Sequence, residues 1–198
     1  MKGSERGYSL LEIMVTVGIG AVISAIAIPM IGATLGNFRL GGDAHSLNNA
    51  LSLTKMRAAA SFTRARLFVD LSTNSFHVET WNSATATWTT EGGTTRLAQN
   101  DIFSFGVVTA APANTQTPIA EATPCLTTAT PALPIANTAC VLFNSRGIPV
   151  DAATLNPTGN FALYITDGTA VFGSTISATG SIRLWRTNPA TTPSWGLQ

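Results

Sequence analysis

The strongest pattern in the chain is an uncharged and mainly apolar run over residues 13–38. As a helix that rises about 1.5 Å per residue, this run is long enough to cross a bilayer core of about 30 Å. Glu12 stands at its start, directly after Leu10 and Leu11. A carboxylate in lipid costs about 2.5 to 3.5 kcal/mol unless a cation pairs with it. The pattern therefore predicts a membrane-length helix in which Glu12 needs a partner.

The helical pattern continues beyond this run. Apolar and small residues recur at steps of three and four and form one stripe of a helix: Leu40, Ala44, Leu47, Leu51, Thr54 and Ala58. We expect one long helix from about residue 9 to about residue 62, softened at Pro29 and at the pair Gly41 and Gly42. Its second half should be amphipathic and pack on the domain that follows.

After residue 62 the pattern changes to alternation, which is typical of strands. Residues 67–71 and 76–81 alternate, with residues 72–75 as the turn of a hairpin. Further strands are predicted at residues 85–90, 102–108, 140–144, 161–166 and 180–186, and turns at 82–83, 92–93, 146–149 and 167–168. Trp81 and Trp88 should pack across the hairpin. The predicted fold class is α+β, with a long N-terminal hydrophobic helix packed on an antiparallel β-sheet domain.

Residues 109–139 differ from the rest of the domain. Alanine, threonine and proline dominate the segment, five of the ten prolines of the chain fall in it, and Glu121 is its only charge. The segment contains no readable regular element, and a loop of this length is usually functional or disordered. Both a mobile surface loop and a specific binding loop are compatible with this composition.

Composition and charge favour an exported protein. Charged residues make up 11% of the 198 residues, and the net charge of +1 indicates no particular partner. Lys2 and Arg6 precede the apolar run, which predicts a cytoplasmic N-terminus and an exported domain. In an exported compartment Cys125 and Cys140 most simply form one disulfide, worth about 3 kcal/mol by chain entropy. Two cysteines exclude a four-thiolate zinc site.

The order of residues around Glu12 carries a resemblance to a known family. A short hydrophilic leader ends at Gly7, followed by Tyr8, a small hydroxyl residue, two aliphatic residues and Glu12, and Pro29 interrupts the apolar run. This order resembles the processing site and first helix of type IV pilins and type II secretion pseudopilins. The resemblance implies that a prepilin peptidase cuts after Gly7 and methylates the amine of Tyr8. It also implies that Glu12 pairs with the N-terminal amine of a neighbouring subunit.

The same resemblance divides the chain into parts. Residues 1–7 would be the leader peptide, residues 8–36 the transmembrane and filament-core helix, and residues 37–198 the periplasmic or extracellular domain. Residues 141–147 and 182–184 are similar to C-terminal pieces of H-type minor pseudopilins and of FimT-like and FimU-like minor pilins. This implies a structural subunit without enzymatic activity, cofactor or metal. Its partners would be other pilins or pseudopilins, the prepilin peptidase and the bacterial inner membrane, before it enters a pilus or pseudopilus.

Two simpler interpretations of the N-terminus stay open. The small residues at positions 25–27 also fit a secretory signal cut after Ala27, although Glu12 and the length of the apolar run argue against it. A plain single-pass anchor would leave Glu12 unexplained. The first residue of the exported protein, Tyr8, Ile28 or Met1, distinguishes the three.

The sequence offers little for catalysis and somewhat more for binding. His45 and His77 are the only histidines, and no nucleophile elbow, zinc-protease run or phosphate loop occurs. Basic residues beside aromatic ones suit DNA, and the candidates are Lys55, Arg57, Arg64, Arg66, Arg183 and Arg186.

Two details bear on the binding alternatives. DNA-uptake pilins of the FimT type carry Gly-Arg-x-Arg, and the nearest match, residues 180–183, lacks the first arginine. Arg183 and Trp185 should share one strand face, and Arg186 should point the other way. As a second alternative, the tryptophans Trp81, Trp88, Trp185 and Trp195 would suit the binding surface of a pilus-tip adhesin.

Overall fold

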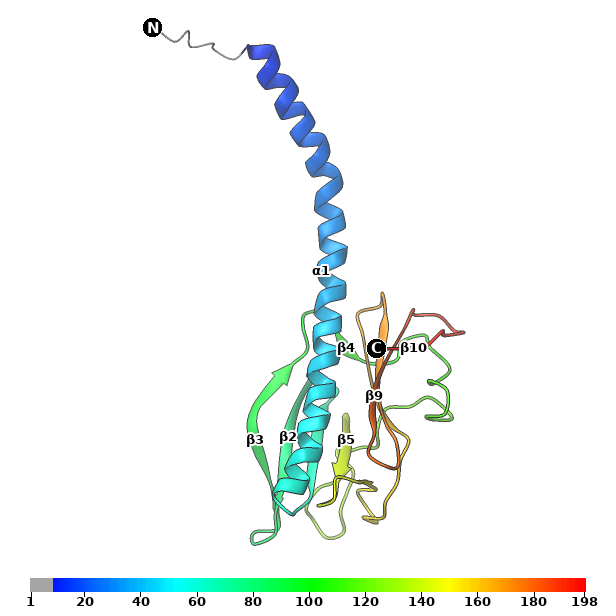
Figure 1. Cartoon of the computed structure of the whole chain (residues 1–198). Helices are drawn as coiled ribbons and strands as arrows, with labels where there is room; N and C mark the ends of the chain where they lie inside the picture. Colours follow the sequence, from blue (N-terminus) through cyan, green and yellow to red (C-terminus); the bar gives the residue numbers. More distant parts are fainter. Residues whose placement is uncertain (1–8) are drawn as a thin grey trace. The chain divides into compact units, whose positions relative to one another are not determined.

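The computed structural model describes residues 9–198, apart from the side chains of residues 28–34. The chain divides into two compact units, and the boundary in the sequence lies between Phe38 and Arg39. Helix α1 runs from Leu10 to Ala60 and contributes to both units (Figure 1). The strands all belong to the second unit.

The ends of α1 are set by local hydrogen bonds. At the first turn the carbonyl of Ser9 accepts hydrogen bonds from the amides of Glu12 and Ile13. At the other end Phe62 adopts a positive φ of 49°, and the amide of Thr63 donates to the carbonyl of Ala58. This is the left-handed ending that satisfies the last carbonyls of a helix. The helix therefore ends two residues before the predicted position, within the usual uncertainty of helix boundaries.

The paired glycines do not interrupt the helix. Gly41 and Gly42 lie inside α1 without a break. Leu40 and Ala44, on either side of the pair, are fully buried. Their burial outweighs the roughly 1 kcal/mol that each glycine costs in a helix interior.

The second unit contains two antiparallel sheets. Sheet A has the order β3-β2-β1-β5-β6, and sheet B has the order β10-β9-β8-β7-β4. Sheet A comprises β1 (Ala65–Asp70), β2 (Ser75–Asn82), β3 (Thr87–Arg96), β5 (Thr138–Phe143) and β6 (Pro149–Val150). Sheet B comprises β4 (Ile102–Phe103), β7 (Phe161–Thr166), β8 (Val171–Ile176), β9 (Ile182–Thr187) and β10 (Gly196–Leu197). The predicted α+β class is confirmed.

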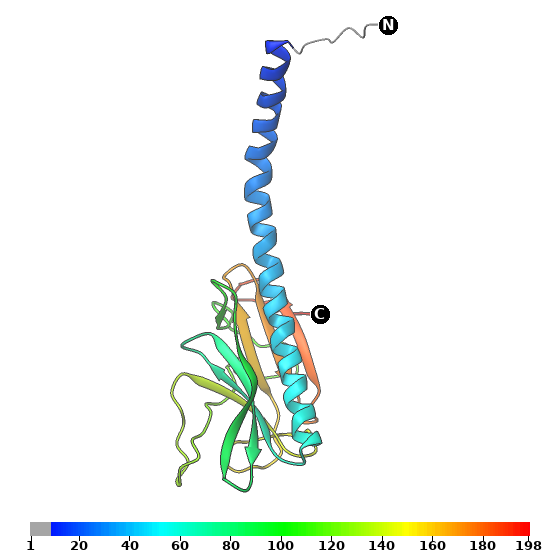
Figure 2. The same ribbon diagram turned by 90° about the vertical axis from the view of Figure 1, so that its left-hand side faces the viewer.

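One hydrophobic core joins both sheets to the C-terminal half of α1. The predicted stripe is buried on the helix, and in Figure 2 the strands of the domain gather beside this part of α1. Sheet A contributes residues such as Leu67 and Val141, and sheet B contributes Leu163, Ile165 and Leu184. The inner faces of both sheets are therefore fixed against the same helix.

Several strand predictions are confirmed and several need correction. The hairpin of β1 and β2 forms as expected, and Trp81 pairs with Trp88 across β2 and β3 with ring centroids 5.1 Å apart. Residues 92–93, predicted as a turn, lie inside β3, because the bulge opposite residues 76–78 accommodates the glycines. The predicted strand at residues 102–108 shortens to β4. Strands β6, β8 and β10 were not predicted.

The segment from residue 109 to residue 137 has only one β-bridge, between Leu126 and Pro134. It is nevertheless fastened at several points, because Ala122 and Cys125 are buried and Glu121 reaches the backbone of β7. The middle of this segment is therefore held against the domain, and the expected mobility of the loop stays a prediction.

Candidate functional site

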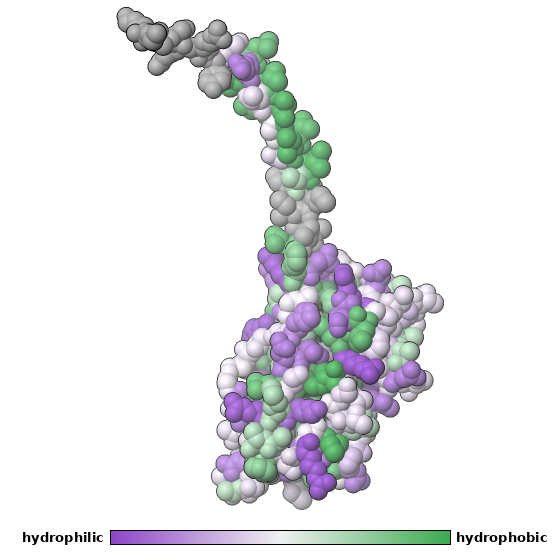
Figure 3. Space-filling view, viewed as in Figure 1, coloured by the Kyte–Doolittle hydropathy of each residue, from purple (hydrophilic) through white to green (hydrophobic). Residues whose placement is uncertain are grey.

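The first part of α1 exposes an apolar surface. Leu10 is 78% exposed and Leu11 is 71% exposed, and further large apolar side chains continue along the helix, as the green surface of Figure 3 shows: Ile13, Met14, Val15, Val17, Ile19, Val22, Ile23 and Ile26. By length and composition residues 10–27 can cross a membrane. Such a surface requires lipid or other helices around it.

The hydroxyl groups in this segment are satisfied by the helix itself. Thr16 Oγ1 donates to the carbonyl of Ile13 at 2.9 Å, and Ser24 Oγ donates to the carbonyl of Gly20 at 2.8 Å. These bonds lower the cost of placing the hydroxyls in lipid. Glu12 is different, because within residues 9–198 its carboxylate forms no ion pair.

The predicted processing residues Gly7 and Tyr8 lie outside the described residues. Pro29 lies within the range of α1. The roles assigned to these three residues stay predictions.

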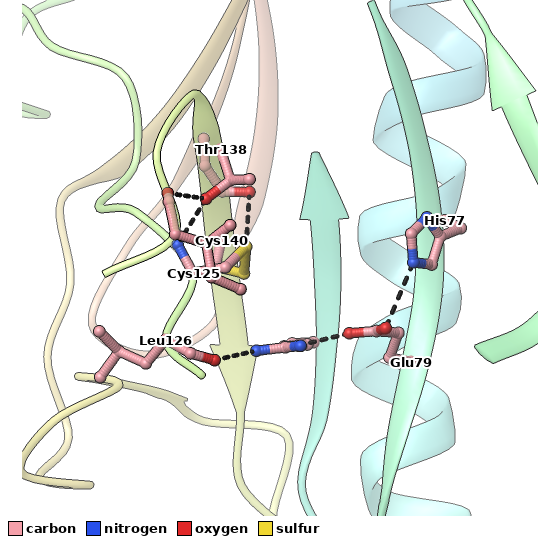
Figure 4. Close-up of a disulfide and its surroundings, with 9 residues drawn as sticks. His77, Glu79, Cys125, Leu126, Thr138 and Cys140 are labelled. Carbon is pink, nitrogen blue, oxygen red and sulfur yellow. Dashed lines mark hydrogen bonds and ion pairs between the residues drawn. A yellow bond between two sulfur atoms is a disulfide. The ribbon is translucent and has the colours of Figure 1, made fainter. Parts of the chain in front are cut away.

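The outer face of sheet A carries a buried ion pair. Arg66 on β1 is 6% exposed and its Nε donates to Glu79 Oε2 on β2 at 2.5 Å. Its Nη1 donates to the carbonyl of Leu126 at 2.9 Å, and His77 Nε2 lies 3.3 Å from Glu79 Oε1 (Figure 4). Breaking a buried pair on one side leaves an uncompensated charge. Arg66 therefore attaches the backbone at Leu126 to sheet A, and its guanidinium group is not available to bind a phosphate.

A disulfide fastens the same segment one residue earlier. Cys125 and Cys140 are bonded, and Cys140 belongs to β5 (Figure 4). Thr138 Oγ1 accepts the amide of Cys125 at 3.0 Å and donates to the carbonyl of Ile135 at 2.7 Å. The predicted disulfide is present.

The two tryptophans of sheet A stand against arginines. The guanidinium carbon of Arg64 lies 4.5 Å from the ring centroid of Trp81, and that of Arg66 lies 4.2 Å from the centroid of Trp88. Contacts of this kind contribute about 0.5 to 2 kcal/mol each. The arginines and tryptophans line a small pocket together with residues 126–129. Burial lowers the pKa of the Arg64 guanidinium.

A buried carboxyl group within residues 109–139, that of Glu121, contacts sheet B. Glu121 Oε2 accepts the amide of Tyr164 on β7 at 3.0 Å, whereas Glu121 Oε1 has no hydrogen-bond partner among the described residues. Burial raises the pKa of Glu121 to about 8. Burial and the nearby Glu121 also raise the pKa of the Tyr164 hydroxyl, which donates to Gln116 Oε1 at 2.9 Å.

A pair of carboxyl groups, Asp43 and Asp101, joins the helix to the turn before β4. Asp101 is 5% exposed, and burial together with the neighbouring Asp43 raises its pKa to about 7. Asp43 Oδ2 accepts the amide of Ala98 at 2.5 Å. No pattern in the sequence pointed to this pair. Residues 9–198 contain no group of three or more histidine, cysteine or acidic side chains that could hold a metal ion.

The six basic residues considered for DNA do not gather on one surface. Lys55 Nζ donates to the carbonyl of Gly180 at 2.9 Å, and Arg57 pairs with Glu91 at 2.9 Å. Arg64 and Arg66 lie on the outer face of sheet A. On β9, Arg183 points outward, whereas the guanidinium of Arg186 lies 5.6 Å from the Phe172 ring on the other face. Arg183 and Arg186 therefore point to opposite faces of β9, as the alternation of side chains along a strand predicts.

Comparison with known proteins bears on the N-terminus. A family model described as the prokaryotic N-terminal methylation motif matches residues 2–28. The chain has the N-terminal motif of type IV pilin-like proteins. The match contains Gly7, Tyr8 and Glu12, the residues that carried the resemblance in the sequence. A comparison with curated proteins returned no match.

Among solved structures, the chain is similar to the minor pseudopilin EpsH from the type II secretion system of Vibrio cholerae. One structure of EpsH has 13% identity and a TM-score of 0.44, over 79% of this chain and 95% of that chain. A second EpsH structure has 12% identity and a TM-score of 0.38, over 81% of this chain and 96% of that chain.

Proposed function

We propose that the chain is a minor pilin or pseudopilin. It would be a structural subunit of a type II secretion pseudopilus or a type IV pilus. Its role would be filament assembly and tip initiation, and so protein secretion. The observation that carries this proposal is the methylation motif over residues 2–28, which runs into an exposed apolar helix where Glu12 is the only charge before Arg39. A soluble enzyme or a soluble binding domain does not require an exposed apolar helix of this length.

The apolar segment serves two environments in this proposal. Before assembly it lies in the inner membrane, with the N-terminus in the cytoplasm and the domain on the far side, as Lys2 and Arg6 favour. In the filament the same side chains pack against neighbouring helices. Both environments remove the surface from water, and each buried Leu or Ile contributes about 1.5 to 3 kcal/mol relative to exposure. Transfer between them therefore preserves the hydrophobic contribution.

Glu12 sets the direction and register of assembly. After the prepilin peptidase cuts behind Gly7, the methylated amine of Tyr8 carries a positive charge. Glu12 has no cation of its own within the described residues. Pairing with the amine of an adjacent subunit removes the cost of an isolated carboxylate in an apolar environment. The partners are accordingly other pilins or pseudopilins.

The test compares Glu12→Ala with Thr16→Val in cells that assemble the filament. Thr16 lies one helical turn further on, and its hydroxyl bonds only to its own helix, so its loss should leave incorporation unchanged. Glu12→Ala should still yield the methylated Tyr8 terminus by mass spectrometry. Because its loss leaves the partner amine buried and unpaired, filament incorporation should fall at least about tenfold.

Two outcomes would contradict the proposal. Normal incorporation of Glu12→Ala would remove the pairing role. A mature terminus at Ile28 or Met1 would show a secretory signal or a plain anchor and would remove the filament subunit altogether.

A further inference from the structure

A polar cleft lies on the outer face of sheet B, and the proposed function assigns no role to it. It has a volume of about 450 Å³ and lies between the strands β8 and β9 and residues 113–115. Leu184 of β9 points into the core and is 5% exposed, so its neighbours Arg183 and Trp185 face outward and line the cleft. Asn114 and Asn160 line it as well.

The aromatic group in the cleft is held in a fixed position. Trp185 Nε1 donates to Thr175 Oγ1 on the adjacent strand at 2.9 Å. With this hydrogen bond made inside the protein, the indole needs no further polar partner and can offer its apolar ring to a ligand. A partly exposed and fixed ring costs little conformational entropy on binding.

The polar groups of the cleft are almost all neutral. They are amides and hydroxyls that can both donate and accept hydrogen bonds: Asn114, Thr115, Asn160, Ser177, Thr179 and Ser181. The carbonyl of Asn160 accepts a hydrogen bond from Gln116 Nε2 at 2.9 Å, which ties the wall of the cleft to the long segment. No acidic residue lines the cleft.

Arg183 supplies the only charge in the cleft. Its side chain is exposed, and among the described residues it forms no ion pair. A guanidinium in such a position matches a planar carboxylate through two parallel hydrogen bonds. The cleft thus joins one aromatic platform, several neutral hydrogen-bonding groups and one cation.

We propose that this cleft binds a carboxylated oligosaccharide. The apolar face of a sugar ring would lie against Trp185, the sugar hydroxyls would bond to the amides and hydroxyls of the wall, and Arg183 would bind the carboxylate. Single-stranded nucleic acid fits less well, because its affinity comes from neutralising several phosphates. The cleft has one cation, and the nearest other arginine on β9, Arg186, lies on the opposite face.

The test uses the full chain in a detergent without a sugar headgroup. Isothermal titration would measure binding of oligogalacturonate, a sialylated oligosaccharide, a neutral galactose oligomer of equal length and oligothymidylate. We expect one of the two carboxylated sugars to bind and the neutral oligomer to bind at least about tenfold more weakly, since a charge-assisted pair is lost. Arg183→Gln should weaken binding of the carboxylated sugar to the same degree. Arg186→Gln is the matched control and should leave it unchanged.

Each contrary outcome overturns the proposal. Failure of both carboxylated sugars at millimolar concentration removes the saccharide site. Tighter binding of oligothymidylate, with the same loss in Arg183→Gln, assigns the cleft to nucleic acid instead. Equal losses in the Arg183 and Arg186 variants would show a nonspecific charge effect. Filament incorporation of Arg183→Gln should be normal. A failure of the saccharide proposal can therefore be distinguished from a failure of the assembly role.

Discussion

Glu121 should make the stability of the domain depend on pH in an unusual direction. Its carboxyl group is buried against β7, and this burial raises its pKa from about 4.5 to about 8. The folded state therefore holds a proton that the unfolded state has already released between these two pH values. Because the native state binds more protons, stability falls as the pH rises through this window.

The size of the effect follows from the same two pKa values. Each tenfold change in proton affinity is worth about 1.4 kcal/mol, so the full loss between pH 4 and pH 9 is at most about 5 kcal/mol. This is a large share of the 5 to 15 kcal/mol that typically stabilises a domain. Well below pH 4.5 the group is neutral in both states and contributes no slope.

Glu121→Gln isolates this contribution. Glutamine keeps an oxygen that can accept the amide of Tyr164, but its amino group would occupy the position of Glu121 Oε1, which has no partner among the described residues. At pH 5 the protonated carboxyl of the wild type carries an unpartnered O–H at the same position, so the exchange should change the stability little there. The variant should therefore be about as stable as the wild type at pH 5 and more stable at pH 9, so the two stability curves should diverge as the pH rises.

The assay is denaturant unfolding of the full chain in detergent at several pH values, followed by tryptophan fluorescence. Trp195 reports on this region, because its ring lies 5.9 Å from that of Tyr164. Asp101→Asn is the comparison variant, since the raised pKa of Asp101 adds a separate slope that should persist in Glu121→Gln. Parallel curves for wild type and Glu121→Gln between pH 5 and pH 9 would refute the reasoning.

Two further predictions concern the packing of the domain. Replacing both Cys125 and Cys140 with alanine should lower the free energy of unfolding by about 3 kcal/mol, because a cross-link across 15 residues is lost. Unfolding of the wild type with and without reductant checks the value. An unchanged unfolding midpoint would contradict the prediction. Gly173→Ala should cost about 1 to 3 kcal/mol in thermal unfolding, because the new Cβ would lie 2.7 Å from the buried ring of Tyr164. Gly168→Ala, whose Cβ meets no atom within 4 Å, tests the strain of a positive φ alone.

The sequence predicted those parts of the fold that follow from a simple period. The helical stripe from Leu40 to Ala58 is buried as expected, and β7 spans the predicted residues 161–166. In both cases the same spacing of apolar residues recurs over several helical turns or residue pairs. Local signals of this kind do not depend on the rest of the chain.

Strand β8 escaped prediction for a reason that the structure explains. Gly173 and Ser174 stand in the middle of the strand, and both residues are typical of turns. The glycine is needed there because the Tyr164 ring of the adjacent strand occupies the space of a side chain. This requirement comes from a tertiary contact, and no local pattern in the sequence contains it.

The buried carboxyl groups of Glu79 and Glu121 differ in how far the sequence could reveal them. Arg66 and Glu79 are directly opposite in the register of the hairpin, so a correctly placed turn is enough to pair them from the sequence. Glu121 lies in a segment without periodicity, and its partner is a backbone amide more than forty residues away. Only the folded arrangement of residues 109–139 shows that this charge is buried.

These contacts also explain why the long segment can be irregular without being loose. The helix holds the inner faces of both sheets, and the segment holds their outer faces. It is bonded to sheet A through Cys140 and Arg66, and four residues earlier it reaches sheet B through Glu121. A regular strand in this position would pair with one sheet edge only. An irregular segment with anchors to both sheets near its middle can bridge them, and its hydrogen-bonding groups at residues 113–115 are then available to form the wall of the cleft on sheet B.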